Sequence, residues 1–191
     1  QRMDQFEFVL VLVSIIIGLA LTELLSVLAR ILRKELDGGL LHSLWMLHVG
    51  VMLVQQFWSR WVVASKPDWS FTDLAVFLLP ALLAFLAASL LSPSGDGEIT
   101  DIDQSFVERR RSFFAVMILL MGTYSLEDRV LHGGHALWVD GTRLAIALLF
   151  LWAAVSAKRR VQLTVAVVTT VVMCVFAFGW TRSLSFLSTI G

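Results

Sequence analysis

The sequence predicts an all-α fold, a polytopic membrane protein built as one bundle of six transmembrane helices. Apolar residues make up 58% of the 191-residue chain and charged residues only 16%, whereas a soluble domain has about 25% charged residues. So few charges cannot cover a water-facing surface of this size. The apolar residues also form continuous runs of the length that a bilayer-crossing helix needs, about 20 residues.

The composition excludes several other classes of protein. A disulfide scaffold is excluded because Cys174 is the single cysteine, and the apolar content excludes a disordered chain. The 15 Lys and Arg residues balance 15 Asp and Glu residues, so there is no net basic field and no nucleic-acid partner is expected. The apolar runs lack the alternation of a membrane β-barrel.

The first two predicted helices cover residues 8–28 and 40–63. The first is an apolar run with an acidic lead, Asp4 and Glu7, and without a small-residue cleavage pattern. We therefore interpret it as a membrane span and not as a cleavable signal peptide. The pair Gly38-Gly39 forms the turn to the second helix, and residues 66–68 (KPD) separate that helix from the third.

The third and fourth predicted helices cover residues 73–91 and 106–131. Pro80 lies inside the third and is expected to kink it, because proline removes a backbone hydrogen bond. A longer loop follows, in which Thr100 and Asp103 have the spacing of a capping box. The capping box predicts a short interfacial helix that leads into the fourth span.

The last two predicted helices cover residues 141–157 and 161–180, and the tight turn AKRRV at residues 157–161 joins them. With the N-terminus outside, the inner loops hold nine Lys and Arg residues and the outer side six. The nine are Arg30, Arg33, Lys34, Arg109, Arg110, Arg111, Lys158, Arg159 and Arg160. Because positive charge concentrates on the cytoplasmic side, both termini are predicted to be periplasmic.

The first predicted helix carries small residues at every fourth position, which places them on one helix face. They are Ser14, Gly18, Thr22 and Ser26. Small residues allow helix backbones to approach closely in lipid, so one interpretation is a packing face. The other is a hydroxyl-lined path for an ion or small solute.

Glu23 is the carboxylate that the apolar pattern places well inside the bilayer, about 10 Å from the Arg30 end of its helix. A carboxylate at this depth is costly unless it is protonated or paired. His48 lies at a similar depth in the second helix and is the expected partner. The alternative is a neutral Glu23 that holds two helices together by hydrogen bonds.

Charged residues at the outer ends of the second and fourth helices are expected to pair. Arg60 and the adjacent Glu127 and Asp128 lie at matching depths, and a paired charge is less costly there than separate charges. Asp128, His132 and His135 could also hold a divalent metal. The glycines between the two histidines indicate a solvated loop as the alternative.

Several stretches resemble an uncharacterised family of bacterial multi-span inner-membrane proteins. They are residues 13–25 (VSIIIGLALTELL), 42–58 (HSLWMLHVGVMLVQQFW), 69–91 (WSFTDLAVFLLPALLAFLAASLL) and 109–115 (RRRSFFA). The resemblance covers about the first two-thirds of the chain. It implies a location in the bacterial inner membrane and no particular activity.

Two classes of function follow as expectations. The first is a homo-oligomeric channel or transporter for an ion or small solute, with its path along the first helix through Glu23 and the small-residue face. The second is a non-catalytic accessory, scaffold or assembly subunit of a larger membrane complex. No enzyme is predicted, because the chain has no zinc-protease, nucleophile-elbow or phosphate-loop motif. The sequence identifies no cofactor.

Overall fold

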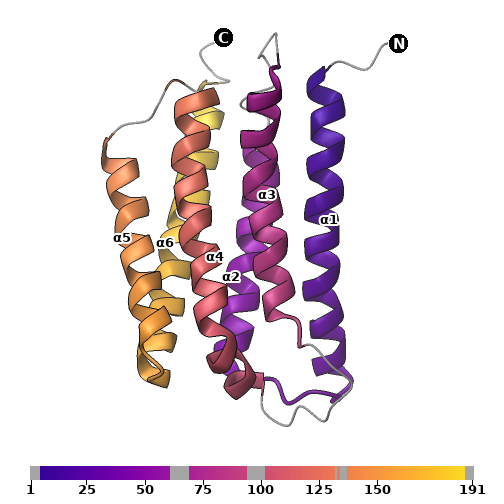
Figure 1. The fold of residues 1–191 in the computed structure, drawn as a ribbon, viewed down its shortest axis with the longest axis vertical. Helices are drawn as coiled ribbons and strands as arrows, with labels where there is room; N and C mark the ends of the chain where they lie inside the picture. Colours follow the sequence, from indigo (N-terminus) through magenta and orange to yellow (C-terminus); the bar gives the residue numbers. More distant parts are fainter. Residues whose placement is uncertain (1–4, 61–68, 94–101, 132, 134–136, 188–191) are drawn as a thin grey trace.

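The computed structural model describes residues 5–60, 69–93, 102–131, 133 and 137–187, with side chains described as far as residue 176. These residues form six helices: α1 (Gln5–Leu32), α2 (Leu40–Ser59), α3 (Phe71–Leu91), α4 (Ile102–Leu131), α5 (Leu137–Val155) and α6 (Arg159–Leu187). They run up and down side by side (Figure 1). We call the end at which α1 begins and α6 finishes the upper end, and the opposite one the lower end.

The prediction of an all-α bundle with six helices is confirmed, and five of the helices are long and apolar enough to cross a membrane. These are α1, α2, α3, α5 and, as far as Phe176, α6. The exception is α4, in which the charged runs at 109–111 and 127–129 leave only 15 uncharged residues, 112–126, between them. The apolar composition is compatible with an integral membrane protein.

The helix bounds differ from the predicted ones mainly at the ends. α4 begins at Ile102 and α5 at Leu137, each four residues before the predicted start. Asp103 and Asp140 in these first turns form ion pairs with neighbouring helices. Of the second predicted helix, residues 61–63 lie outside the described residues.

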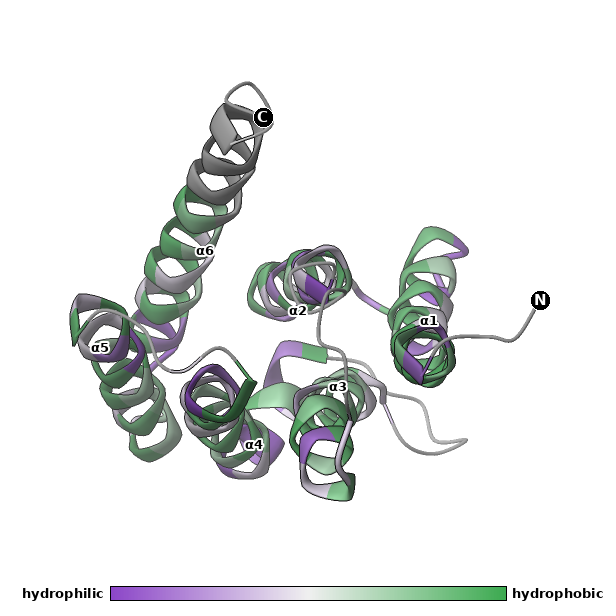
Figure 2. Cartoon of the chain, turned by 90° about the horizontal axis from the view of Figure 1, so that it is seen from above, coloured by the Kyte–Doolittle hydropathy of each residue, from purple (hydrophilic) through white to green (hydrophobic). Residues whose placement is uncertain are grey.

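α2, α3 and α4 form the middle of the bundle, with α1 on one side of them and α5 and α6 on the other. α1 packs against α3 and α2, while α5 packs against α4, and α6 against α2 and α5 (Figure 2). Alanines on the buried side of α3 allow close packing, since Ala81, Ala84 and Ala88 are fully buried. Large apolar side chains such as Ile15, with 56% of its surface exposed, cover the outer face of the bundle, as expected for a surface in contact with lipid.

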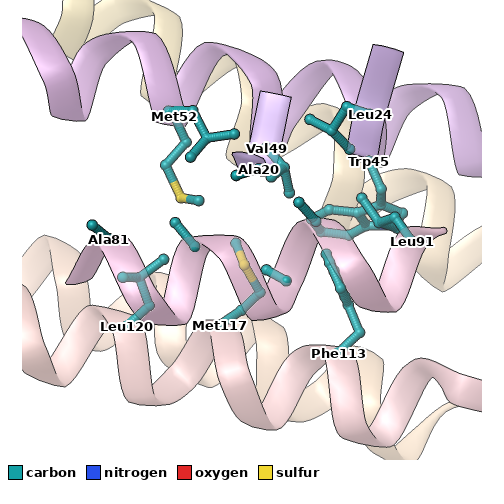
Figure 3. Packing of buried hydrophobic residues seen from close by; sticks show 14 of the residues in the cluster. Ala20, Leu24, Trp45, Val49, Met52, Ala81, Leu91, Phe113, Met117 and Leu120 are labelled. Carbon is teal, nitrogen blue, oxygen red and sulfur yellow. The ribbon is translucent and has the colours of Figure 1, made fainter. Parts of the chain in front are cut away.

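Aromatic rings fill the interior between α2, α4 and α5. The ring of Trp45, which has no exposed surface, lies 5.1–6.0 Å from the rings of Phe113, Phe114 and Phe150. Figure 3 shows Trp45 and Phe113 beside the aliphatic side chains that continue this core. Most of these pairs meet edge to face, the arrangement that the quadrupoles of aromatic rings favour.

Candidate functional site

The most deeply buried charges lie at the upper end of the bundle, where α2 and α4 finish. Arg60, only 2% exposed, forms an ion pair with Glu127, which is 7% exposed. The guanidinium also lies 4.3 Å from the centre of the Phe77 ring of α3, within the range of a cation–π contact. The structure therefore confirms the expected pairing of Arg60 with Glu127. It also shows that α3 contacts this pair through Phe77.

Gln56 connects this ion pair to the proline of α3. With its amide oriented so that the oxygen faces donors, Gln56 accepts hydrogen bonds from Arg60 Nη2 at 2.8 Å and from the backbone N–H of Ala81 at 2.9 Å. Ala81 directly follows Pro80, the residue expected to disturb the helical hydrogen bonds. Gln56 thus satisfies a backbone group at the proline and a buried cation at the same time.

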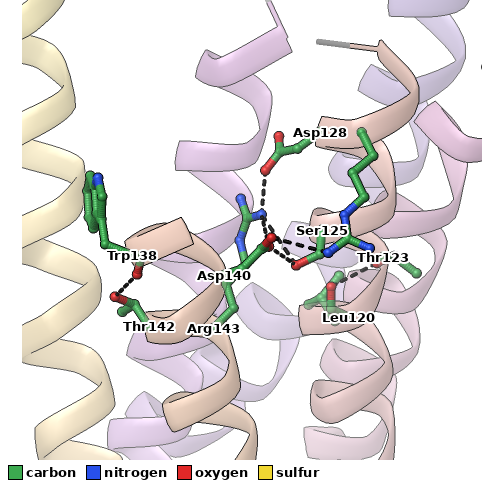
Figure 4. Close-up of polar contacts among 9 residues, drawn as sticks. Leu120, Thr123, Ser125, Asp128, Trp138, Asp140, Thr142 and Arg143 are labelled. Carbon is green, nitrogen blue, oxygen red and sulfur yellow. Dashed lines mark hydrogen bonds and ion pairs between the residues drawn. The ribbon is translucent and has the colours of Figure 1, made fainter. Parts of the chain in front are cut away.

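A second group of charges joins α4 to α5 (Figure 4). Asp128 pairs with Arg143. Asp140 accepts a hydrogen bond from the Ser125 hydroxyl at 2.8 Å and another from Arg129 at 3.2 Å. Asp128 therefore pairs with α5 and not with Arg60.

The two groups together hold three arginines and three carboxylates: Arg60 and Glu127 join α2 to α4, and the other four residues join α4 to α5. Removing one member of a buried ion pair typically costs 3–5 kcal/mol, because the other charge remains buried without a partner. We therefore interpret these paired charges as an interhelical lock. It contains no unpaired group that could act as a nucleophile or a general base.

The predicted path along α1 lies on the outside of the bundle. Gly18, Thr22 and Ser26 are exposed, and a side-chain carbon placed on Gly18 would meet no neighbouring atom within 4 Å. Ser14 and Thr22 donate their hydroxyl hydrogens to the carbonyls of Leu10 and Gly18 in their own helix, at 2.7 and 2.8 Å. This face is therefore available to lipid or to another helix, and its hydroxyl oxygens can still accept hydrogen bonds.

Glu23 and His48 lie in different surroundings. Glu23 is half-buried and makes no hydrogen bond or ion pair within the described part of the chain. His48 is 4% exposed and shares a 3.1 Å hydrogen bond with the Thr170 hydroxyl of α6, and its ring packs against Trp45 and Phe150. The Glu23–His48 pair is thus absent among the described residues, because His48 faces α6 and the aromatic core.

At the lower end, Asp103 of α4 caps the N-terminus of α2. Its carboxylate accepts from the backbone N–H groups of His42 at 2.9 Å and Leu41 at 3.5 Å. Gly39, the N-cap residue, has no side chain for this role, and a side-chain carbon there would clash with Asp103. Arg159 of α6 balances the carboxylate at 3.0 Å.

Thr100 of the expected capping box lies outside the described residues, and the carboxylate of Asp103 contacts α2 and α6. His42, buried beside Asp103, donates from Nε2 to the carbonyl of Leu91 at 2.7 Å, which ties α2 to the end of α3. Gln162 of α6 donates to the carbonyls of Ala153 and Ser156, both at 2.6 Å. The lower ends of the helices are thus joined by side chains that satisfy helix termini.

The candidate metal site cannot be assembled from the described residues. His132 and His135 lie outside them, and Asp128 is paired with Arg143. Within the described ranges no group of three His, Cys, Asp or Glu side chains has the geometry to hold a metal ion.

Sequence reasoning missed the structural role of Thr170, and it did not identify the partners of Gln56 and Asp103. Gln56 and Thr170 are polar positions in apolar helices, a pattern that identifies them as candidates but not their partners. Asp103 follows Gly39 by 64 positions, so only the tertiary fold shows that it caps α2. Comparisons of the chain with protein-family models, curated protein sequences and solved structures give no match.

Proposed function

We propose that the protein is an integral membrane protein of six spans that works as a homo-oligomer, in which copies meet along the outward face of α1 and share an ion or small-solute path. The observation that carries the proposal is Glu23, half-buried and without a polar partner in the described part of the chain, next to the exposed Gly18, Thr22 and Ser26. An ionisable group at such a depth normally faces a helix interface or a water-filled space.

A path between copies is favoured over a path through one copy. The rings of Trp45, Phe113, Phe114 and Phe150 have no exposed surface and fill the space between α2, α4 and α5. An ion cannot pass through closely packed aromatic rings. Small side chains on α1 leave room for a second helix to approach, and the Thr22 oxygen and the Glu23 carboxyl would face the joint.

The sixth span in this proposal is α4. Its 15 uncharged residues, 112–126, are shorter than a usual span, but Glu127 and Asp128 are paired with Arg60 and Arg143. Pairing lowers the cost of placing these charges at the membrane boundary. With six spans, and the nine basic residues of the lower end in the cytoplasm, both termini are periplasmic in a bacterial inner membrane.

The second candidate is a non-catalytic accessory or scaffold subunit. The paired charges and the filled core favour it, because the buried charges of α2, α4 and α5 serve to hold helices together. In that case the outward face of α1 binds a different membrane protein, and Glu23 hydrogen-bonds to that partner.

Cysteine cross-linking in membranes tests the assembly. In a Cys174→Ser background, Thr22→Cys is expected to give a disulfide-linked dimer on mild oxidation, because copies meet at this position. Leu148→Cys serves as the matched control, since Leu148 is likewise exposed but lies on α5. Cross-linking to a foreign protein favours the accessory subunit, and equal dimerisation at both positions contradicts the α1 interface.

Ion flux into liposomes tests the path. Glu23→Gln preserves size and hydrogen bonding but cannot ionise, so flux is expected to fall while the fold is unchanged. Glu108→Gln, an exposed carboxylate on α4, is the control and should leave flux as it is. If the cysteine variant forms cross-linked dimers but the unaltered protein shows no ion flux, the homo-oligomer is supported and the ion path is excluded.

A further inference from the structure

His42 carries two of the contacts that hold the lower end of α2 in place. Its backbone N–H donates to the Asp103 carboxylate of α4 at 2.9 Å. Nε2 of its ring donates to the carbonyl of Leu91, the last residue of α3, at 2.7 Å. A movement of this one residue therefore breaks both the cap of α2 and the tie between α2 and α3.

The other nitrogen of the His42 ring is enclosed and unpaired. The residue is 2% exposed, and its Nδ1 atom has no hydrogen-bond partner among the described residues. A carbonyl oxygen can only accept, so Nε2 carries the hydrogen of the uncharged ring and Nδ1 is left as an acceptor. Protonation would place a second N–H group and a positive charge where no acceptor receives them.

The charged groups around His42 do not compensate for such a proton. Asp103 attracts a positive charge, but it already pairs with Arg159 of α6 at 3.0 Å and accepts from two backbone N–H groups of α2. Arg109 of α4 lines the same small cavity as His42, and its charge repels a second cation. From α3 the ring meets the Leu91 carbonyl, which already accepts from Nε2.

That cavity lies where the start of α2, the end of α3 and the start of α4 meet, and its volume is about 10 Å³. Ser105 and Phe106 line it together with His42. It has room for about one water molecule. One water can carry a proton to the ring, but it cannot replace the hydration that a cation has in bulk water. The closed arrangement therefore favours the neutral ring, whereas an open lower end, with water around His42, allows the charged one.

We propose that His42 is a pH-sensitive latch: acidification charges its imidazole and releases the lower end of α2 from α3 and α4. Above about pH 6.5, the usual midpoint of an exposed imidazole, the ring is neutral in both arrangements and pH has no effect. Below it, the open arrangement binds a proton that the closed one does not, so falling pH favours opening. The side of the membrane that the latch senses, the cytoplasm, rests on the proposed function, but the latch itself does not.

Backbone hydrogen exchange of the purified full-length protein in detergent tests the latch. Mass spectrometry follows the peptides that cover the start of α2 at about pH 7.5 and about pH 5.5, one unit on either side of the imidazole midpoint, with correction for the intrinsic pH dependence of exchange. Protection is expected to fall about tenfold at the lower pH, the factor for one proton bound only in the open arrangement. His42→Gln keeps an N–H donor for the Leu91 carbonyl but cannot be charged, so its protection should be the same at both pH values.

His48→Gln is the matched control, because His48 is a second buried histidine of α2 but bonds through Nδ1 to Thr170. It should keep the tenfold response at the start of α2. His42→Met, which cannot be charged either, should lose the response as His42→Gln does, and circular dichroism checks that all variants are folded. The latch is overturned if the unaltered protein shows no change between the two pH values. It is also overturned if either His42 variant responds as fully as the unaltered protein, or if His48→Gln loses the response.

Discussion

The ion pair of Arg60 and Glu127 allows a sharp test of how the upper end is held together. Arg60→Met removes a cation that contacts Glu127, Gln56 and Phe77, and it leaves the buried Glu127 carboxylate without its partner. Breaking a buried pair in this way costs about 3–5 kcal/mol. Loss of the cation–π contact adds on the order of 1 kcal/mol.

The double variant Arg60→Met/Glu127→Met separates the ion pair from simple loss of packing. With both charges removed, no buried charge is left alone, and apolar replacement of a buried pair is often neutral. Gln56 loses one hydrogen-bond donor, which costs about 1 kcal/mol. The double variant is therefore expected to lie within about 2 kcal/mol of the unaltered protein, and to be more stable than Arg60→Met.

Unfolding by SDS in mixed micelles, followed by tryptophan fluorescence and circular dichroism, measures these free energies. Arg129→Met is the control, because the exposed pair of Arg129 and Asp140 should contribute less than about 1 kcal/mol. If Arg60→Met costs no more than the control, or if the double variant is less stable than both single ones, the interpretation of Arg60 and Glu127 as an interhelical lock is wrong.

Three further substitutions test the remaining contacts by the same unfolding measurement. Gly39→Ala places a carbon against Asp103 and is expected to destabilise by about 1–2 kcal/mol through loss of the cap; an unchanged midpoint would contradict the capping role. Thr170→Val removes the hydrogen bond to His48 and should cost about 1 kcal/mol, whereas Thr22→Val, which changes only a bond within its own helix, should cost less. Trp45→Ala empties the centre of the aromatic core and should cost about 3–5 kcal/mol; a loss below 1 kcal/mol would show that the ring is dispensable.

The helices could be predicted from the sequence because the signal is local. A continuous apolar run of about 20 residues has one stable form in lipid, the helix, in which backbone hydrogen bonds are satisfied internally. The pairing of Arg60 with Glu127 also followed from position along the chain, since both lie at the same end of their helices and the lipid favours a paired charge.

Which face of each helix meets which neighbour could not be predicted in the same way. Small residues at every fourth position identify a face of α1 but do not say whether it packs inside the bundle, and the structure turns Gly18 and Thr22 outward. Likewise, depth alone made His48 a partner for Glu23, but the rotation of α2 directs His48 to Thr170 of α6. Depth is fixed by the apolar pattern, while rotation depends on side-chain packing between helices.

The sequence by itself determined the class of fold, the helices and the approximate depth of each charge, because these follow from the free energy of placing each residue in lipid or water. Only the tertiary structure decided that Asp103 caps α2 across the bundle, that Gln56 bridges Arg60 and the turn after Pro80, and that the small-residue face of α1 points outward. Those contacts join residues far apart in the chain, and their partners are set by how the helices rotate to fill the space around one aromatic core.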